Sequence, residues 1–228
     1  MALFLSGGGD PPLSIALDEA FAEAVSDRLV IYLPTALAGT QLFDGAGAWF
    51  SDTYAPLGLA NVEVWQNLDG RSLLGRGHLG GVYLGGGNTY LLLRELRRTG
   101  LDLELRELID RGVHVYGGSA GAIVLGSDIT TSDLGGDERV DGLMDFAGLD
   151  VLSGWSVSCH YTRDHDSFLA GWVSDASHSR VLLLGEDTGA VFDGDRLAVL
   201  GPTAAVVRRQ RAMDWLAAGT QSWPLPSS

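Results

Sequence analysis

The feature that most constrains the fold is the stretch 112–125, where a strand pattern passes through a glycine-rich turn into a helix pattern. Val113 and Val115 alternate as in a strand, and small and apolar residues follow Ser119 at helical density. Residues 117–121 read Gly-Gly-Ser-Ala-Gly and fit the G-x-S-x-G pattern of a nucleophile elbow. A serine on so sharp a turn sits in strained backbone, so its neighbours must lack bulk. The following helix would direct its N-terminal N–H groups at a developing oxyanion.

The same pattern also fits an ordinary glycine-rich turn with an incidental serine. The strand pattern before the turn and the helix pattern after it are the context that the reactive-serine motif requires. This context favours a nucleophilic Ser119 over the structural interpretation.

The flanking elements predict the fold class. Apolar strand patterns alternate with amphipathic helix patterns as far as residue 185, which indicates an α/β protein with one mostly parallel sheet and helices on both faces. Short strand patterns then follow one another and predict an antiparallel edge. The expected strands are 2–6, 29–33, 62–65, 80–84, 113–117, 155–159, 180–184, 190–192, 196–200 and 204–207, and the expected helices are 13–26, 49–58, 90–98, 103–111, 120–125 and 166–174.

Two segments are expected to lie outside these elements. The polar, glycine-rich segment 130–148 predicts a surface loop over the edge of the sheet, and the tail 221–228 predicts a loose end. Because no linker or repeat divides the 228 residues, we expect a single domain spanning 1–228.

Charge and cysteine content limit the partners. The net charge of −14, with only 15 basic residues, argues against nucleic acid or an anionic membrane surface as a partner. The start of the chain lacks the basic region of a signal peptide, and no apolar run reaches the ~18 residues of a membrane span. Cys159 is the single cysteine, so an intramolecular disulfide is excluded and a cytoplasmic location is expected. No metal motif such as H-E-x-x-H occurs, and no cofactor is expected.

A serine nucleophile needs a base within hydrogen-bond reach. Of the five histidines, His160 directly follows an apolar strand pattern, where a strand end would present it beside the serine. His114 lies within a strand pattern, His165 in a charged helix start, and His78 and His178 in polar loops. We therefore predict His160 as the base.

A histidine base needs an acceptor that fixes its tautomer, usually a carboxylate. Glu186 stands at the end of an apolar strand pattern and is our first choice, while Asp133, in the loop after the elbow helix, is the rival. The oxyanion needs N–H donors, for which Ala120 and a glycine of the 85–88 loop, Gly86 or Gly87, are the candidates. That loop lacks the lysine and the spacing of phosphate-binding motifs.

Five segments occur in one order: 85–89 (Gly-Gly-Gly-Asn-Thr), 118–122 (Gly-Ser-Ala-Gly-Ala), 130–133 (Thr-Thr-Ser-Asp), 160–162 (His-Tyr-Thr) and 185–188 (Gly-Glu-Asp-Thr). Together they resemble the serine peptidase family of peptidase E (aspartyl dipeptidase) and cyanophycinase, most convincingly over residues 80 to 200. The resemblance implies a fold like that of class I glutamine amidotransferases and a serine peptidase of short peptides, dipeptidase-like, that acts through an acyl-enzyme.

The resemblance also implies roles for single residues. It implies Ser119 as nucleophile, His160 as base and Glu186 as the orienting acid, with the amides of Gly87 and Ala120 as the oxyanion hole. Gly86, Asn88 and Asp133 are expected to lie near the substrate.

The chain departs from aspartyl dipeptidases in one respect. These enzymes carry an arginine some distance past the histidine, suited to a substrate carboxylate, whereas segment 161–167 is shorter and acidic here. Arg163 is the residue that could serve, very close to His160. The sequence therefore does not predict strict specificity for an N-terminal aspartate, and the acidic surroundings suit a substrate's α-amino group.

Two other functions remain open at this stage. An esterase-type α/β-hydrolase would place its acid before its histidine, with Asp133 or Asp150 as that acid, and a non-catalytic relative would bind a small molecule at the same site. The tryptophans at 49, 65, 215 and 223, taken as exposed, are compatible with a homodimer.

Overall fold

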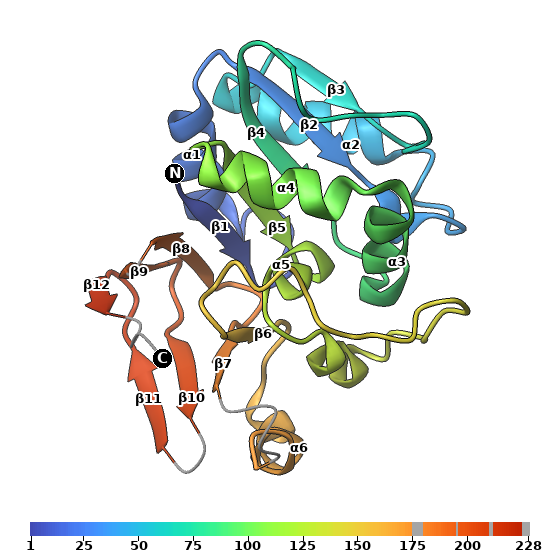
Figure 1. Cartoon of the computed structure of the whole chain (residues 1–228). Coiled ribbons are helices and arrows are strands. Elements are labelled where there is room, and N and C mark those ends of the chain that lie inside the picture. The colour runs from blue at the N-terminus through green and yellow to red at the C-terminus, as the bar shows by residue number, and fades with distance from the viewer. Residues whose placement is uncertain (175–179, 195, 210–211, 225–228) are drawn as a thin grey trace.

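The computed structural model of this chain describes residues 1–174, 180–194, 196–209 and 212–224 (Figure 1). Within these ranges, every strand and helix predicted before residue 185 is present, with ends shifted by a few residues.

The larger sheet has the predicted character. Within the described residues it contains eight strands in the order β12-β9-β8-β1-β5-β4-β2-β3. Its first five strands in the chain are parallel and the other three pair antiparallel, beginning with β8 against β1. The strands are β1 (Leu3–Ser6), β2 (Leu29–Leu33), β3 (Val62–Val64), β4 (Leu79–Leu84), β5 (His114–Gly118), β8 (Gly189–Asp193), β9 (Arg196–Leu200) and β12 (Gln221–Pro224).

The prediction of one sheet is wrong, because four other strands form a second sheet in the order β11-β10-β7-β6. β6 (Ser156–Ser158) pairs parallel with β7 (Arg180–Leu183), and the hairpin of β10 (Ala205–Arg209) and β11 (Ala212–Leu216) continues this sheet. β8 occupies the free edge of β1, so β6 and β7 cannot join the larger sheet there. The two predicted site segments, which follow β6 and β7, therefore approach Ser119 from a separate sheet.

The prediction of a loose tail is also wrong for residues 221–224, which form β12 against β9; residues 225–228 lie outside the described part of the chain. Strand β11 has no counterpart in the sequence prediction. A local pattern gives no sign of either strand because each depends on an antiparallel partner supplied by another segment.

Helices cover both faces of the larger sheet (Figure 1). α1 and α2 lie on one face and contribute to a core with Phe21 and Phe50, whereas α3, α4 and α5 lie on the other. α6 packs against the second sheet. The helices are α1 (Ile15–Val25), α2 (Ala46–Tyr54), α3 (Thr89–Thr99), α4 (Leu101–Asp110), α5 (Ala120–Leu125) and α6 (Asp166–Trp172), with 3₁₀ turns at Thr35–Leu37, Ala55–Leu57, Thr130–Gly135 and Arg163–His165. None of the helices in the described ranges has the length and apolar character needed to cross a membrane.

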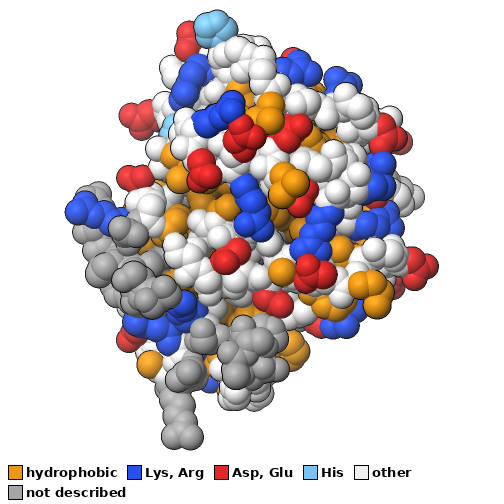
Figure 2. Space-filling view, viewed as in Figure 1, with side chains coloured by type: hydrophobic (Ala, Val, Ile, Leu, Met, Phe, Trp, Pro, Cys, Tyr) orange, Lys and Arg blue, Asp and Glu red, His pale blue; other side chains and the backbone are white. Residues whose placement is uncertain are grey.

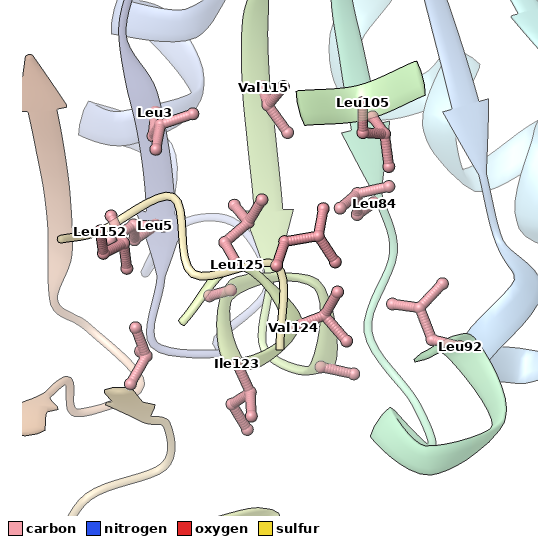
Figure 3. Packing of buried hydrophobic residues seen from close by; sticks show 14 of the residues in the cluster. Leu3, Leu5, Leu84, Leu92, Leu105, Val115, Ile123, Val124, Leu125 and Leu152 are labelled. Carbon is pink, nitrogen blue, oxygen red and sulfur yellow. The ribbon is translucent and has the colours of Figure 1, made fainter. Parts of the chain in front are cut away.

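Helix α5 is short but central. Ile123, Val124 and Leu125 belong to the same hydrophobic cluster as Leu5 of β1 and Val115 of β5 (Figure 3). These five side chains are all buried. Since fully burying such a side chain is worth about 1.5–3 kcal/mol, packing of this kind fixes the helix that follows Ser119.

Segment 130–148 was expected over the edge of the sheet, and this is wrong for most of it. Only Thr130–Gly135 lies against an edge strand, where Thr131 Oγ1 donates to the carbonyl of Val157 in β6. The rest runs along α3, where Arg97 donates to the carboxylate of Asp145 over 3.2 Å and Arg94 to the carbonyl of Asp141. The arginines on the polar face of α3 thus hold the loop. Figure 2 shows acidic and basic side chains interspersed across the face viewed in Figure 1.

The tryptophans differ in exposure from the prediction. Trp65 is buried, with 1% of its surface exposed, and the prediction for it is wrong. Trp49 is half-buried, whereas Trp215 on β11 is 50% exposed. The side chain of Trp223 lies outside the described part.

A buried carboxylate connects α1 to its neighbours. Asp18 accepts hydrogen bonds from Ser14 Oγ, from Tyr54 OH on α2 and from Tyr116 OH on β5, each over 2.7 Å. Burial raises the pKa of Asp18 above its ordinary value, although the three hydroxyl donors act in the opposite direction.

We predict from this that Asp18 makes stability depend on pH. When folding raises the pKa of a carboxyl group, the protonated form of that group stabilises the folded state. Its contribution to the free energy of unfolding is full below the unfolded-state pKa of 3.8. This contribution is lost as the pH rises through the higher pKa of the folded state. In urea unfolding between about pH 3.5 and pH 7, the free energy of unfolding of the wild type should fall relative to that of Asp18→Asn.

The exposed Asp52 on α2 provides the control, since Asp52→Asn removes the same charge without burial. The curves of wild type and Asp52→Asn should stay parallel. A wild type that gains stability relative to Asp18→Asn over this range would contradict the prediction.

Candidate active site

The turn around Ser119 has the geometry that the sequence predicts. β5 ends at Gly118 and α5 begins at Ala120, with Ser119 between them at φ 46° and ψ −103°. This conformation is strained for a residue with a side chain. A Cβ atom at Gly117 would lie 2.5 Å from the amide nitrogen of Ala122, and one at Gly121 would lie 2.2 Å from the carbonyl oxygen of Leu84. The small residues are therefore a steric requirement of the turn.

The structure brings Ser119, His160 and Glu186 together. Ser119 Oγ lies 2.8 Å from His160 Nε2, and His160 Nδ1 lies 3.2 Å from Glu186 Oε1. His160 follows β6 and Glu186 follows β7, so the two parallel strands of the second sheet deliver them side by side. Their side chains are partly open to solvent, with 41% of His160 and 61% of Glu186 exposed.

The glycine triplet after β1 holds the imidazole, a role that the sequence did not predict. The amide of His160 donates to the carbonyl of Gly7 over 2.9 Å, and the amide of Gly9 donates to the carbonyl of Glu186 over 3.1 Å. A Cβ atom at Gly8 would lie 2.2 Å from His160 Cε1. The sequence places residues 7–9 at the end of a strand, at the edge of the sheet where Ser119 stands, but it does not show what they contact.

The predicted oxyanion donors lie near Ser119. Ala120 opens α5, so its N–H has no partner within the helix. Gly86 is close to Ser119, because a Cβ atom at Gly86 would lie 3.5 Å from Ser119 Cβ. Gly87 has φ 127°, and a Cβ there would lie 2.4 Å from the carbonyl oxygen of Ala36. Among the described residues, no protein acceptor is bonded to the amides of Gly86, Gly87 or Ala120.

Asn88, Arg163 and Asp133 were predicted near the substrate, and each contacts other parts of the protein. Asn88 caps α3, accepting from the amide of Leu91 and donating to the carbonyl of Glu138. Arg163 stacks over the ring of Trp215, 5.3 Å from its centroid.

Asp133 accepts hydrogen bonds from Tyr90 OH and from Arg139, the latter over 2.9 Å. Burial and the bond to Asp133 raise the pKa of Tyr90 to about 12. The carboxylate that borders the cavity beside Ser119 is that of Asp137, whose Oδ2 accepts from the amide of Thr89.

The remaining histidines have other surroundings. His114 Nδ1 accepts from the amide of Ala2, and burial lowers the pKa of His114. His165 accepts from the amide of Thr162 at a helix start, and His78 lies in the loop before β4. His178 lies outside the described residues.

Cys159 lies beneath the site, with Sγ 3.5 Å from the carbonyl oxygen of Ser6 and 3.6 Å from that of Ser119. Burial raises the pKa of its thiol, which keeps it protonated and unreactive. In the described ranges, no group of three His, Cys, Asp or Glu side chains is placed to hold a metal ion.

Cavities open on two sides of Ser119. On one side, a cavity of about 240 Å³ is bordered by His160, Gly87 and Asp137. On the other, a cavity of about 80 Å³ is bordered by Gly8, Gly86 and Ser119. A molecule bound in both would cross the serine hydroxyl.

The comparisons with known proteins agree with the resemblance seen in the sequence. The model of peptidase family S51 matches residues 2–200. Peptidase E proteins from Escherichia coli (strain K12 / DH10B) and Shigella boydii serotype 18 are 29% identical over 139 residues, which is 60% of this chain and 56% of each relative. The chain thus aligns with little more than half the length of these relatives.

Two solved structures share the fold. A peptidase from an acI-B1 actinobacterium matches with a TM-score of 0.72 at 18% identity, over 97% of this chain and 96% of that one. A protein assigned to peptidase E from Listeria monocytogenes EGD-e matches with a TM-score of 0.64 at 23% identity, over 88% of this chain and 98% of that one. The fold is α/β and class I glutamine amidotransferase-like, as expected.

We predict that Gly8→Ala disables the site without unfolding the protein. The added methyl group overlaps the imidazole of His160 and must displace it from Ser119 Oγ. Since general base catalysis contributes at least about 100-fold, the rate at which a fluorophosphonate labels Ser119 should fall by about that factor.

Gly112 serves as the matched control, because it has φ 91° and a Cβ atom added there would meet no other atom within 4 Å. Gly112→Ala introduces similar backbone strain, and in this variant the fluorophosphonate should label Ser119 at the wild-type rate. Equal labelling of Gly8→Ala and Gly112→Ala would show that the imidazole does not depend on this contact.

Proposed function

The chain belongs to peptidase family S51, and from that premise we propose that it is a serine-type peptidase that hydrolyses short peptides through an acyl-enzyme. In this proposal Ser119 is the nucleophile, His160 the base and Glu186 the acid that orients it. The observation that carries the proposal is the continuous line from Ser119 Oγ to His160 Nε2 at 2.8 Å and from His160 Nδ1 to Glu186 Oε1 at 3.2 Å.

The first step is attack on the peptide carbonyl. Glu186 accepts the Nδ1–H bond of His160, which leaves Nε2 as the free base. Nε2 takes the proton from Ser119 Oγ as that oxygen bonds to the carbonyl carbon. The carbonyl oxygen becomes an oxyanion, and the amides of Ala120 and Gly87 donate to it.

The second step releases the amine. The imidazolium of His160 returns its proton to the leaving nitrogen as the C–N bond breaks, which leaves an ester on Ser119. Water then loses a proton to His160 Nε2 and attacks this ester, and the same proton restores the hydroxyl of Ser119. The products are a carboxylic acid and an amine, and the protein ends in its starting state.

The size of the cavities favours a short substrate. The spaces that border Ser119 measure about 80 and 240 Å³, and neither matches the extended groove that a long chain would need. Two or three residues fill such spaces, so we propose small peptides as the substrates.

Ser119→Ala should abolish turnover of a dipeptide panel, to at least about 10⁴-fold below the wild type, because it removes the atom that forms the ester. The variant should keep the wild-type melting temperature, since Ala at this position leaves the turn unchanged. Mass spectrometry of fluorophosphonate-treated wild type should place the label on Ser119.

The outcomes distinguish the alternatives. Labelling of Ser119 with turnover of carboxylic esters and none of any peptide would indicate an esterase. A folded wild type without labelling or turnover would indicate a binding protein, and either result removes the proposal.

Glu186→Gln should lower kcat by about 10- to 100-fold, less than the ~10⁴-fold loss that follows removal of a buried triad acid, because solvent screens a carboxylate that is 61% exposed. The measurement is kcat on one dipeptide at constant ionic strength. Asp133→Asn is the comparison variant, because Asp133 is bonded to Tyr90 and Arg139 rather than to His160. A larger loss in Asp133→Asn than in Glu186→Gln would reverse the assignment of the acid.

A further inference from the structure

A larger cavity adjoins the site on the side away from the histidine. It measures about 330 Å³ and is bordered by the rings of Tyr32, Trp49 and Tyr83, by Leu37 and Ala46, and by the carboxylate of Asp10. We call it the aromatic pocket. Its volume lies at the lower end of the roughly 300–1,000 Å³ of small-molecule sites, and most of its lining is apolar.

The aromatic pocket adjoins the small cavity at Ser119. Asp10, Trp49, Tyr83 and Gly86 border both spaces, and Ser119 borders the smaller one. A group attached to a carbonyl at Ser119 Oγ would therefore lie next to the pocket.

The walls of the pocket are held in place by other rings. Tyr83 stacks on Tyr116 with centroids 4.3 Å apart, and Tyr32 stacks on Phe50 at 4.7 Å. Tyr32 and Tyr83 meet edge to face at 5.2 Å. The space is thus formed before a ligand arrives, which lowers the cost of binding.

The position of His160 decides which part of the substrate enters the pocket. The imidazole must give its proton to the leaving amine, so the amine side of the scissile bond lies in the cavity that His160 borders. His160 borders neither the aromatic pocket nor the small cavity at Ser119, as far as the described residues show. The aromatic pocket consequently faces the residue that supplies the acyl group.

The charges select the chemistry of that residue. Among the described residues, no Lys, Arg or His borders the aromatic pocket or the small cavity at Ser119. An acidic side chain would lie there unpaired and close to Asp10, at a high desolvation cost. The carboxylate of Asp10 is exposed and has no hydrogen bond among the described residues, so it can bind the α-ammonium group.

We propose that the aromatic pocket binds a large apolar side chain, preferably an aromatic one, on the N-terminal residue of the substrate, and that Asp10 binds the α-ammonium group of the same residue. This inference rests on the proposed function. It makes the protein a peptidase for short peptides that begin with Phe, Tyr, Trp or Leu.

The test is a panel of dipeptides with a constant second residue, namely Phe-Leu, Leu-Leu, Ala-Leu, Asp-Leu and Lys-Leu. The kcat/KM of the wild type for Phe-Leu should exceed that for Asp-Leu by at least about 100-fold and that for Ala-Leu by at least about 10-fold. Equal or higher kcat/KM for Asp-Leu or Lys-Leu would overturn the proposal.

Two variants test the pocket itself. Trp49→Ala removes one wall and should reduce the preference for Phe-Leu over Ala-Leu at least several-fold. Gly45→Leu should act in the same direction by filling the space, since a Cβ atom at Gly45 meets only the carbonyl oxygen of Leu42 at 3.8 Å. Phe168→Ala, on α6 and 41% exposed, is the matched aromatic control and should keep the wild-type preference. An unchanged preference in folded Trp49→Ala and Gly45→Leu would overturn the proposal.

The role of Asp10 is tested with Phe-Leu and N-acetyl-Phe-Leu. The wild type should favour the free amine at least about 10-fold, and Asp10→Asn should lose most of this ratio, because a neutral amide attracts an ammonium group much less. A ratio that Asp10→Asn leaves unchanged would remove Asp10 from the proposal.

Failure of the pocket and failure of the proposed function give different results. If a fluorophosphonate labels Ser119 and the panel shows no preference for large apolar residues, the pocket assignment is wrong and the peptidase proposal stands. If neither labelling nor turnover occurs, calorimetry of Phe-Leu and Asp-Leu with Ser119→Ala still decides the pocket, because tighter binding of Phe-Leu supports it and equal or weaker binding overturns it.

Discussion

The close approach of the Gly7–Gly9 backbone to His160 and Glu186 is the contact on which the site depends. The larger sheet carries Ser119, whereas the second sheet carries the histidine and the glutamate. The hydrogen bonds from the amide of His160 to Gly7 and from the amide of Gly9 to Glu186 join the two. A Cβ atom at any of the three glycines would overlap His160 or the backbone of residues 185–186. The triplet therefore sets how near the imidazole comes to the hydroxyl of Ser119.

Loops at the same edge of the sheet also form the walls of the cavities around Ser119. In the proposed mechanism, the loops after β1 and β4 border the acyl side, with aromatic rings behind them, and the segments after α5 and β6 border the amine side. In the same mechanism His160 stands on the amine side, where it delivers a proton. The arrangement gives the two halves of a substrate different surroundings, and this asymmetry is the basis of the specificity that we propose.

The sequence was sufficient for the parts of the site that local geometry dictates. The turn at Ser119 could be predicted because a strand, a tight turn and a helix leave a pattern of small residues, and the strand-end positions of His160 and Glu186 because each follows an apolar strand. Asn88, predicted near the substrate, instead caps α3, and its side chain is used there.

Other features depend on contacts between distant segments and could not be predicted. The second sheet forms because β8 occupies the edge of β1, which no local pattern reveals. Likewise Asp137, rather than Asp133, borders the cavity, because Tyr90 and Arg139 hold Asp133. The role of Gly8 follows only from the position of an imidazole 152 residues further along the chain.

The exposure of Glu186 has a consequence for the conditions under which such a site works. A carboxylate that is 61% open to solvent attracts counterions from the surrounding medium, and at physiological ionic strength these act over a distance of about 8 Å. In the proposed mechanism the imidazolium of His160 draws somewhat less stabilisation from its partner as dissolved electrolyte increases, and only somewhat, because their separation of 3.2 Å is shorter than this screening length. Turnover then falls only modestly as the salinity of the medium rises.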